Sequence, residues 1–419
     1  MNSLVTAALL LAIFVTVGLR LWLGSRQLRH VAAHRSAVPT EFAASIELTQ
    51  HQKAADYTIT KTRFNLANAV ADAGLLLVLT LGGLLQICAD LAARFFEPAG
   101  YAWGLALFAL SGLIGFVVDL PFSLWRTFVI EVRFGFNKMT PALFVADLLK
   151  QALLTALVGG PLLLAVLWLM QRMGGLWWLW VWGVWLSFNL AVLLLYPTLI
   201  APLFNKFSPM EEGPLKARIE ALLTRCGFRS SGLFVMDGSK RSAHGNAYFT
   251  GMGSNKRIVF FDTLIEKLAP AEIEAVLAHE LGHFRCHHVV KRLLLLSALS
   301  LGFLWLLAQL MQSPAFYAGL GVAGTGSGST AMALLLFSLV LGVFTFPLSP
   351  LLSALSRRHE YQADAYAAQN ADGGELVHAL VKLYRDNAAT LTPDPLHSAF
   401  YDSHPPASLR IARLQGVLP

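Results

Sequence analysis

Seven long apolar stretches dominate this chain and decide what it can fold into. A helix needs about 20 mostly apolar residues to cross the hydrocarbon core of a bilayer. Of the 419 residues, 56% are hydrophobic and only 14% are charged, which is too apolar for an ordinary soluble protein. We therefore predict a polytopic membrane protein of the mainly α class with about seven transmembrane helices. The stretches are 4–23, 68–91, 103–125, 153–170, 176–200, 293–311 and 331–355.

The distribution of basic residues predicts the orientation in the membrane. Lys and Arg crowd the first, third and fifth connections and the tail from Arg357 onwards, whereas the other connections hold little beyond Arg94 and Arg172. Cytoplasmic loops carry the excess of positive charge, so we expect the N-terminus outside and the C-terminus in the cytoplasm. The net charge of +7 then needs no nucleic-acid partner. The compact loops favour a bacterial inner membrane.

The polar parts of the chain predict its domain organisation. We expect residues 1–200 to form the first five spans and 293–356 the last two. Residues 201–292 and 357–419 are too small to hold separate cores, so they should pack together as one cytoplasmic domain. Its pattern predicts a helix at 213–226 and strands at 232–236, 246–250 and 257–261, a small β-sheet. The Gly/Ser-rich segment 319–329 reads as an external flexible loop.

A metal-binding pattern lies in this cytoplasmic part. His279, Glu280 and His283 form an H-E-x-x-H, and apolar residues at helical spacing from 272 to 281 place both histidines on one helix face. Two imidazoles at i and i+4 can hold a zinc ion, and a carboxylate beside them can take a proton from water. Because a lone H-E-x-x-H also arises by chance, the rest of the chain must supply support.

A third ligand is needed for a catalytic zinc ion. On a continuous helix His287 lies about 12 Å along the axis from His279, too far to share one ion. We therefore interpret His287 and His288 as polar residues at the membrane surface.

Glu360 is the better candidate for the third ligand. With Asp364 at i+4, one helix could present a ligand carboxylate and a second carboxylate that accepts the free N–H of a zinc histidine. The alternative is two solvated charges beside Arg357 and Arg358. If the H-E-x-x-H helix continues unbroken into the span at 293, the site lies about 15 Å from that span. This position favours membrane-attached substrates.

These motifs carry a resemblance to a known family. The chain resembles the type I CAAX prenyl endopeptidases, membrane zinc proteases of the gluzincin kind, over most of its length. The paired metal motifs of that family match H-E-L-G-H at His279 and E-Y-Q-A-D at Glu360. Further matches are HQKAADYT from His51, FGFNK from Phe134, APLFNKF from Ala201, NAYFTG from Asn246 and DSHPP from Asp402.

The resemblance implies a fold and a set of roles. Family members have seven spans enclosing a water-filled chamber, with a cytoplasmic site for one zinc ion per chain. The implied zinc ligands are His279, His283 and Glu360, with Glu280 as general base and Asp364 orienting His279. The substrate peptide would add as a strand beside Asn246, Ala247, Tyr248 and Phe249. His404 and Arg410 match positions thought to stabilise the oxyanion.

Three functions remain open at this point. The first is a zinc endopeptidase that cleaves near the C-terminus of prenylated CAAX-type peptides or of other membrane-associated substrates. The second is a broad-specificity quality-control protease for membrane proteins, which would use the same chemistry. A third, remote alternative is a transporter or channel in which Asp72, Asp119 and Asn189 line a path and the H-E-x-x-H is incidental.

Overall fold

The membrane part of the fold consists of long helices. The computed structural model describes residues 2–250 and 257–416. Within them six helices are long and apolar enough to cross a membrane, and a seventh span results if α2 (Leu48–Leu79) and α3 (Leu84–Ala93), bent by 52°, count as one. This agrees with the expected number of spans. The others are α1 (Asn2–Ala33), α4 (Tyr101–Trp125), α6 (Pro141–Leu154) with α7 (Gly160–Arg172), α8 (Trp177–Leu195), α12 (His288–Leu310), and α14 (Thr330–Thr345) with α15 (Ser349–Asn370).

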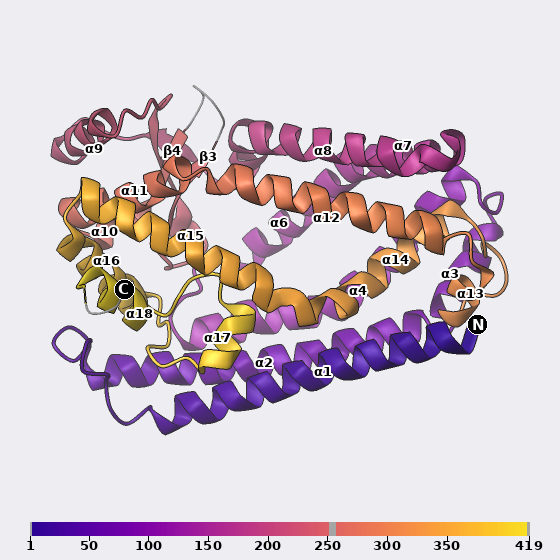
Figure 1. Cartoon of the computed structure of the whole chain (residues 1–419), viewed down its shortest axis with the longest axis horizontal. Helices are drawn as coiled ribbons and strands as arrows, with labels where there is room; N and C mark the ends of the chain where they lie inside the picture. Colours follow the sequence, from indigo (N-terminus) through magenta and orange to yellow (C-terminus); the bar gives the residue numbers. More distant parts are fainter. Residues whose placement is uncertain (1, 251–256, 417–419) are drawn as a thin grey trace.

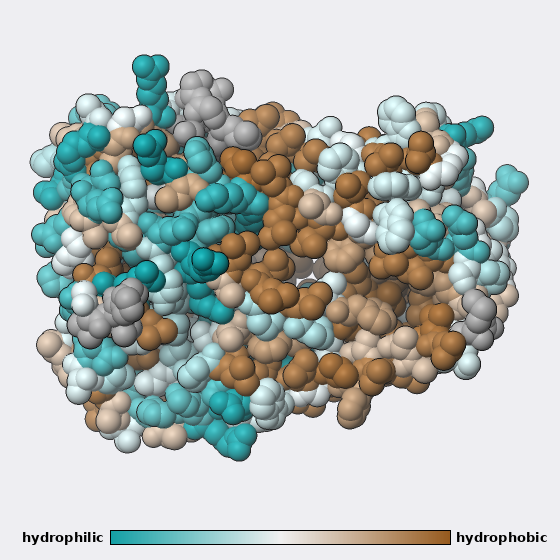
Figure 2. All heavy atoms as spheres, viewed as in Figure 1, coloured by the Kyte–Doolittle hydropathy of each residue, from teal (hydrophilic) through white to brown (hydrophobic). Residues whose placement is uncertain are grey.

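The long helices lie along one axis of the molecule. Helices α1 and α2 run side by side along one edge, and the two termini lie at opposite ends (Figure 1). Figure 2 shows hydrophilic side chains gathered at the end that holds the C-terminus, a hydrophobic band over the middle, and some hydrophilic residues again at the opposite end. This division is the one expected of an integral membrane protein with a polar domain at one end.

The polar end combines short helices with a four-stranded mixed sheet. The strands are β1 (Phe207–Pro209), β2 (Leu233–Met236), β3 (Ala247–Thr250) and β4 (Arg257–Phe261), in the order β1-β2-β4-β3. Strands β2 and β4 are parallel, and the outer pairs are antiparallel. The last three strands were predicted, whereas β1 is too short to be recognised by alternation. The helices here are α9 (Pro214–Arg225), α10 (Asp262–Lys267), α11 (Pro270–Arg285), α16 (Gly373–Asp386), α17 (Pro395–Tyr401) and α18 (Ala407–Leu414).

Both polar regions of the sequence contribute to one hydrophobic core. Ile219, Phe260 and Leu277 from the first region pack in the same buried cluster as Leu376 and Ala379 from the tail. This shared core is what their small sizes predicted. It fixes α11 and α15 against each other, and these two helices carry the paired motifs.

Two expectations about the segments that connect helices were wrong. The H-E-x-x-H helix does not run unbroken into the next span, because His287 adopts a left-handed conformation (φ 56°) that ends α11 before α12 begins at His288. The segment 319–329 is packed and not a free loop. Following α13 (Pro314–Gly319), the left-handed Gly326 lies so close to Trp103 that a Cβ would be 2.3 Å from the ring.

Short irregular turns lie within three of the spans. The π-helical turns Arg126–Ile130, Thr155–Gly159 and Tyr196–Ile200 interrupt the long helices, and α5 (Glu131–Arg133) follows the first of them. Prolines at 161 and 197 lack the N–H that an α-helical ladder requires, which accounts for the irregularity near two of these turns.

Candidate metal centre and peptide-binding edge

Three side chains from two helices converge at the polar end. His279 and His283 lie on one face of α11, and Glu360 comes from α15. The two Nε2 atoms are 3.3 Å apart, and the carboxylate oxygens of Glu360 lie 3.4 Å from Nε2 of His279 and 3.3 Å from Nε2 of His283. These atoms form a cluster that could hold a metal ion.

The spacing of these atoms fits tetrahedral zinc. Four ligands at about 2.0 to 2.1 Å from zinc lie about 3.3 Å from one another. The Oε2 atom of Glu360 is buried and has no hydrogen-bond partner among the residues that the structure describes. The nearest Lys or Arg cation is the guanidinium of Arg410, whose Nη1 lies 3.8 Å from Oε2, too far for a hydrogen bond. A buried carboxylate oxygen without a hydrogen bond is costly, and a metal ion among the three side chains would satisfy it.

Asp364 and Arg410 hold His279 from behind. Oδ1 of Asp364 lies 2.8 Å from Nδ1 of His279, so Nε2 is left facing the cluster. The guanidinium of Arg410 donates from Nε to Oδ2 of Asp364 at 2.8 Å, and from Nη2 to Oδ1. All three side chains are buried. The second carboxylate on α15 is therefore neutralised by an arginine and orients a histidine.

The same carboxylates change the proton affinity of the histidine. Burial lowers the pKa of His279, but the neighbouring carboxylates of Asp364 and Glu360 outweigh burial and raise it to about 9. A metal ion at Nε2 must displace the proton that the ring would otherwise hold below that pH, so metal binding strengthens as the pH rises.

His283 has a partner that the sequence interpretation missed. Its Nδ1 lies 3.0 Å from Nδ1 of His288, whose Nε2 lies 2.8 Å from Oε1 of Gln362. The ring of His359 stacks on His288 with centroids 4.0 Å apart. His288 is buried, so its assignment to the membrane surface was wrong, whereas His287 is exposed. The left-handed turn at His287 brings His288 back towards His283, a change of direction that helical spacing does not reveal.

A close approach of backbones brings α11 and α15 together. A Cβ on Gly282 would lie 2.8 Å from Cα of Ala363. Ala278 and Ala367 are also almost fully buried. Small side chains therefore allow the helices to approach until the ligands meet, which gives the glycine inside the H-E-x-x-H a structural reason.

Two further predicted residues lie at the exposed side of the cluster. Glu280 is half-buried and makes no hydrogen bond or ion pair with any described residue, so its carboxylate is free to act. His404 is 60% exposed, and its Nε2 lies 3.5 Å from Oε1 of Glu360. Arg410, by contrast, is buried behind Asp364.

The predicted peptide-binding segment forms the edge of the sheet. Strand β3 is the last strand in the order and pairs only with β4 among the described strands. The carbonyl of Asn246 accepts from the N–H of Phe261, so in this antiparallel register the backbone groups of Ala247 and Phe249 point away from β4. The N–H of Ala247 lies 2.9 Å from Oδ1 of Asn246. An extended peptide can pair with this edge.

An ion pair ties the loop before β3 to a membrane helix. Arg241 donates to both carboxylate oxygens of Asp147 on α6, at 2.9 and 3.0 Å, and to Oδ1 of Asn205 at 2.9 Å. Ser242 and Asn137 form an isolated antiparallel β-bridge between their backbones. Two segments that carried the resemblance, from Phe134 and Ala201, therefore meet the loop that leads into the third, from Asn246. The Asp147–Arg241 contact was not predicted.

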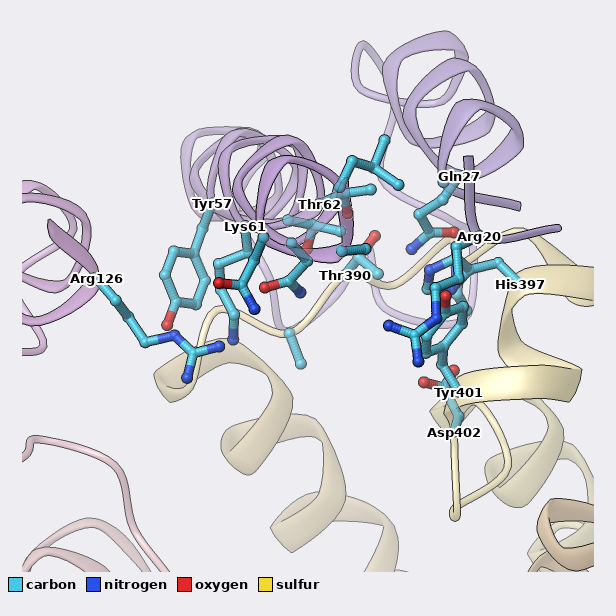
Figure 3. A pocket seen from close by; sticks show the side chains of 18 of the residues that line it. Arg20, Gln27, Tyr57, Lys61, Thr62, Arg126, Thr390, His397, Tyr401 and Asp402 are labelled. Atoms are coloured by element: carbon cyan, nitrogen blue, oxygen red, sulfur yellow. The ribbon is translucent and has the colours of Figure 1, made fainter. Parts of the chain in front are cut away.

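A polar cavity of about 730 Å³ lies among the spans. Figure 3 shows Arg20, Lys61 and Arg126 on its wall with Tyr401 and Asp402. His244 also lines it, two residues before Asn246. The wall of the cavity thus combines α1, α2 and part of the tail with the loop that leads into β3.

Comparisons with known proteins agree with this description. A family profile described as "CAAX prenyl protease N-terminal, five membrane helices" matches residues 27–206, and one described as "Peptidase family M48" matches residues 209–418. CAAX prenyl protease 1 of Saccharomyces cerevisiae is 37% identical over 344 residues, covering 78% of this chain and 76% of the relative.

A human relative and a crystal structure match over nearly the whole chain. The CAAX prenyl protease 1 homolog of Homo sapiens is 31% identical, covering 94% of this chain and 92% of the relative. The crystal structure of Ste24p from S. mikatae superposes with a TM-score of 0.89 at 30% identity, covering 99% of this chain and 98% of that chain.

Proposed function

The chain belongs to the CAAX prenyl protease family of M48 peptidases, and on this basis we propose that it cleaves prenylated CAAX-type peptides with a zinc ion. It is an integral, multi-pass membrane metalloendopeptidase of this family. The metal identity, the residue roles and the lipidated substrate are the proposed parts.

One observation carries the proposal. Nε2 of His279, Nε2 of His283 and a carboxylate of Glu360 are spaced as tetrahedral zinc requires, and Oε2 of Glu360 accepts no hydrogen bond from any described residue. An incidental H-E-x-x-H in a transporter would not explain a third ligand at that spacing.

The side chains divide the work of hydrolysis. A zinc ion bound to His279, His283 and Glu360 would polarise the scissile carbonyl and make water more acidic. Glu280 takes the proton from the attacking water and returns it to the leaving amine, a role for which its unpaired carboxylate is suited. The backbone of β3 holds the peptide extended through the outward groups of Ala247 and Phe249.

His404 and Arg410 act in different ways in this proposal. His404 is exposed beside Glu360 and can donate to the oxygen that becomes negative in the transition state. The guanidinium of Arg410 is already bound to Asp364, so we assign it to fixing Asp364 and, through it, the ring of His279.

A membrane-attached, lipidated substrate is supported by the position of the site. The proposed peptide-binding edge is tied to α6 through Arg241 and Asp147, and the wall of a polar cavity among the spans includes His244, two residues before that edge. The curated relatives are named CAAX prenyl proteases. A peptide with a lipid at one end could remain in the bilayer while its extended backbone pairs with β3.

The orientation and the domain limits also belong to the proposal. The excess of Lys and Arg in alternate connections supports an external N-terminus and a cytoplasmic C-terminus and site. Residues 201–292 and 357–419 would form the catalytic domain between and after the spans of 1–200 and 293–356. The bacterial inner membrane remains a prediction from loop lengths, and the relatives named above are eukaryotic.

A paired-peptide assay tests the substrate class. Purified protein is given a farnesylated CAAX-type peptide and its unlipidated twin, and release of the C-terminal fragment is followed for both. The proposal expects much faster turnover of the lipidated peptide. Equal turnover would reject prenyl specificity and favour the quality-control alternative, since the chemistry of bond cleavage is common to both.

A further inference from the structure

A basic groove lies outside the catalytic site, where the membrane helices meet the sheet. Its volume is about 570 Å³, and a smaller pocket of about 180 Å³ continues it beside the π-helical end of α8. The end of α8 lies next to β3 and β4 in Figure 1. The two pockets share Pro202, Phe207, Phe234 and Arg257. We call this surface the basic groove.

The groove holds more positive charge than its carboxylates can balance. Lys150, Lys206, Lys240 and Arg257 line it together with one acid, Asp237, so its formal charge is +3. No ion pair with a carboxylate is present for any of the four cations among the described residues. Oδ1 of Asp237 accepts the backbone N–H of Lys206 at 2.7 Å. Like charges held together without counter-charges mark a surface prepared for an anion.

The cations are held by neighbouring groups that leave their charge available. The ammonium of Lys150 donates to the carbonyl of Leu203 at 2.8 Å and lies 5.9 Å from the ring centroid of Phe204. The guanidinium of Arg257 lies 5.2 Å from the centroid of Phe234. Aromatic faces attract cations without neutralising them, so these two side chains are positioned and remain able to bind phosphate.

The sheet turns a second face towards this groove. Ile258 and Phe260 of β4 point into the catalytic core, so the alternating Arg257 and Val259 point the other way. Val259 is paired with Tyr248 on the peptide-binding strand. Binding in the groove would therefore brace the sheet from the side opposite the metal cluster.

The groove opens beside side chains that face lipid. Leu149, Leu153 and Leu199 are each at least 60% exposed, and Leu203 is 49% exposed. These residues belong to the helical segments 141–172 and 174–203, which are long and apolar enough to span the bilayer. Exposed leucines on such segments are covered by acyl chains in a membrane. Cations directly beside them lie at the depth of the lipid headgroups.

We propose that the basic groove binds the phosphate of an anionic phospholipid whose acyl chains lie against the exposed leucines of α6 and the end of α8. Charge complementarity selects an anion, and the adjoining apolar surface selects one that carries acyl chains. A free phosphate satisfies only the first requirement. The bound lipid would fasten the sheet, with its peptide-binding edge, to the membrane surface.

Native mass spectrometry of the full-length protein tests this site. The protein is released from nanodiscs containing phosphatidylcholine with or without phosphatidylglycerol, and lipids that remain bound are counted. We expect one retained phosphatidylglycerol per chain and no comparable retention of phosphatidylcholine. The variant K206Q/K240Q/R257Q should bind that phosphatidylglycerol about a hundredfold more weakly. Each cation near the surface strengthens binding by about tenfold or less, so the loss of three cations together accounts for this decrease.

A matched variant separates the groove from net charge. The variant R29Q/R229Q/R292Q removes three exposed cations outside the groove, on the side of the protein that we expect to be cytoplasmic, and it should retain the lipid. Equal loss in both variants, or no loss in the groove variant, overturns the proposal. So does displacement of phosphatidylglycerol by inorganic phosphate at equal concentration, because the acyl chains would then contribute nothing. Equal melting temperatures of the two variants show that both are folded.

Discussion

At the scale of single residues, the site depends on how each polar side chain is engaged. Asp364 is buried and fully bonded to Arg410 and His279, whereas Glu280 has no described partner. A carboxylate that is neutralised by an arginine orients other groups, and one that is free can exchange a proton. The two carboxylates near the candidate metal ligands therefore have different proposed roles: Asp364 orients His279, and Glu280 exchanges a proton.

Replacing Glu280 by Gln tests the general base. The amide has the same shape but cannot accept the proton of water, so turnover of a cleavable peptide should fall by about 10² to 10⁴-fold. The zinc content, measured by inductively coupled plasma mass spectrometry, should stay at one equivalent because the proposed ligands are unchanged. E220Q on the exposed face of α9 serves as the matched control and should keep full activity. Hydrolysis that survives in E280Q would remove Glu280 from this role.

Replacing His288 by Ala tests the residue that the sequence interpretation misplaced. Loss of the acceptor for Nδ1 of His283 should weaken zinc binding by about 10 to 100-fold, as for other groups that orient metal ligands. Affinity is measured by competition with a chelator. H288N can restore an acceptor and should recover part of the affinity. H287N, at an exposed left-handed position that Asn tolerates, should keep the turn and show none of the effect. Unchanged affinity in H288A would show that His288 only fills space.

At the scale of elements, the candidate metal ligands come together because two helices approach unusually closely. Helix α11 supplies two ligands and α15 the third, and no loop connects them directly. Gly282, Ala363 and their small neighbours set the distance between the two backbones. Packing of the helices and binding of the metal are therefore one property, since a shift of about 1 Å would spoil the ligand spacing.

Gly282→Ala tests this dependence. A helical Gly→Ala change alone would add about 0.5 to 1 kcal/mol of stability. Here the new Cβ would lie 2.8 Å from a backbone atom of Ala363, and overpacking of this kind costs about 1 to 3 kcal/mol. The clash should win, so both melting temperature and zinc affinity fall. Gly302→Ala on α12 meets nothing within 4 Å and should not lower either quantity. A stable, zinc-binding G282A would contradict the close-packing account.

At the scale of the whole molecule, the proposed peptide-binding edge is held by contacts from distant parts of the chain. Arg241 before β3 reaches Asp147 on a membrane helix, and His244 lies 3.2 Å from Asn387 of the tail. The edge strand is thus placed relative to the spans by long-range polar contacts. The position of this strand relative to the spans therefore depends on the complete fold.

Asp147→Asn tests the link between membrane and peptide edge. The Asp147 and Arg241 side chains are only 10% and 18% exposed, and breaking such a pair leaves an uncompensated charge that costs about 3 to 5 kcal/mol. We expect a lower melting temperature and a higher KM with a smaller effect on kcat. The matched control is Asp56→Asn, which breaks an Arg–Asp pair that is about 40% exposed and worth at most about 1 kcal/mol. Equal KM values in D147N and the parent protein would argue against positioning of the edge.

The sequence by itself determined the features that local periodicity encodes. The length of the apolar stretches gave the membrane spans, the spacing of His279 and His283 gave a shared helix face, and alternation predicted β2, β3 and β4. Each of these depends on neighbours within a few residues. The i, i+4 spacing of Glu360 and Asp364 favoured them as partners of that face, and the resemblance implied the role of each.

Only the tertiary structure decided what depends on distant segments meeting. The turn at His287 redirects the chain and buries His288 against His283. The buried guanidinium of Arg410 forms an ion pair with Asp364. The uncompensated cations of the basic groove come from four separate segments. Spacing along one helix cannot anticipate such contacts, because burial and charge pairing depend on every element that packs around a residue.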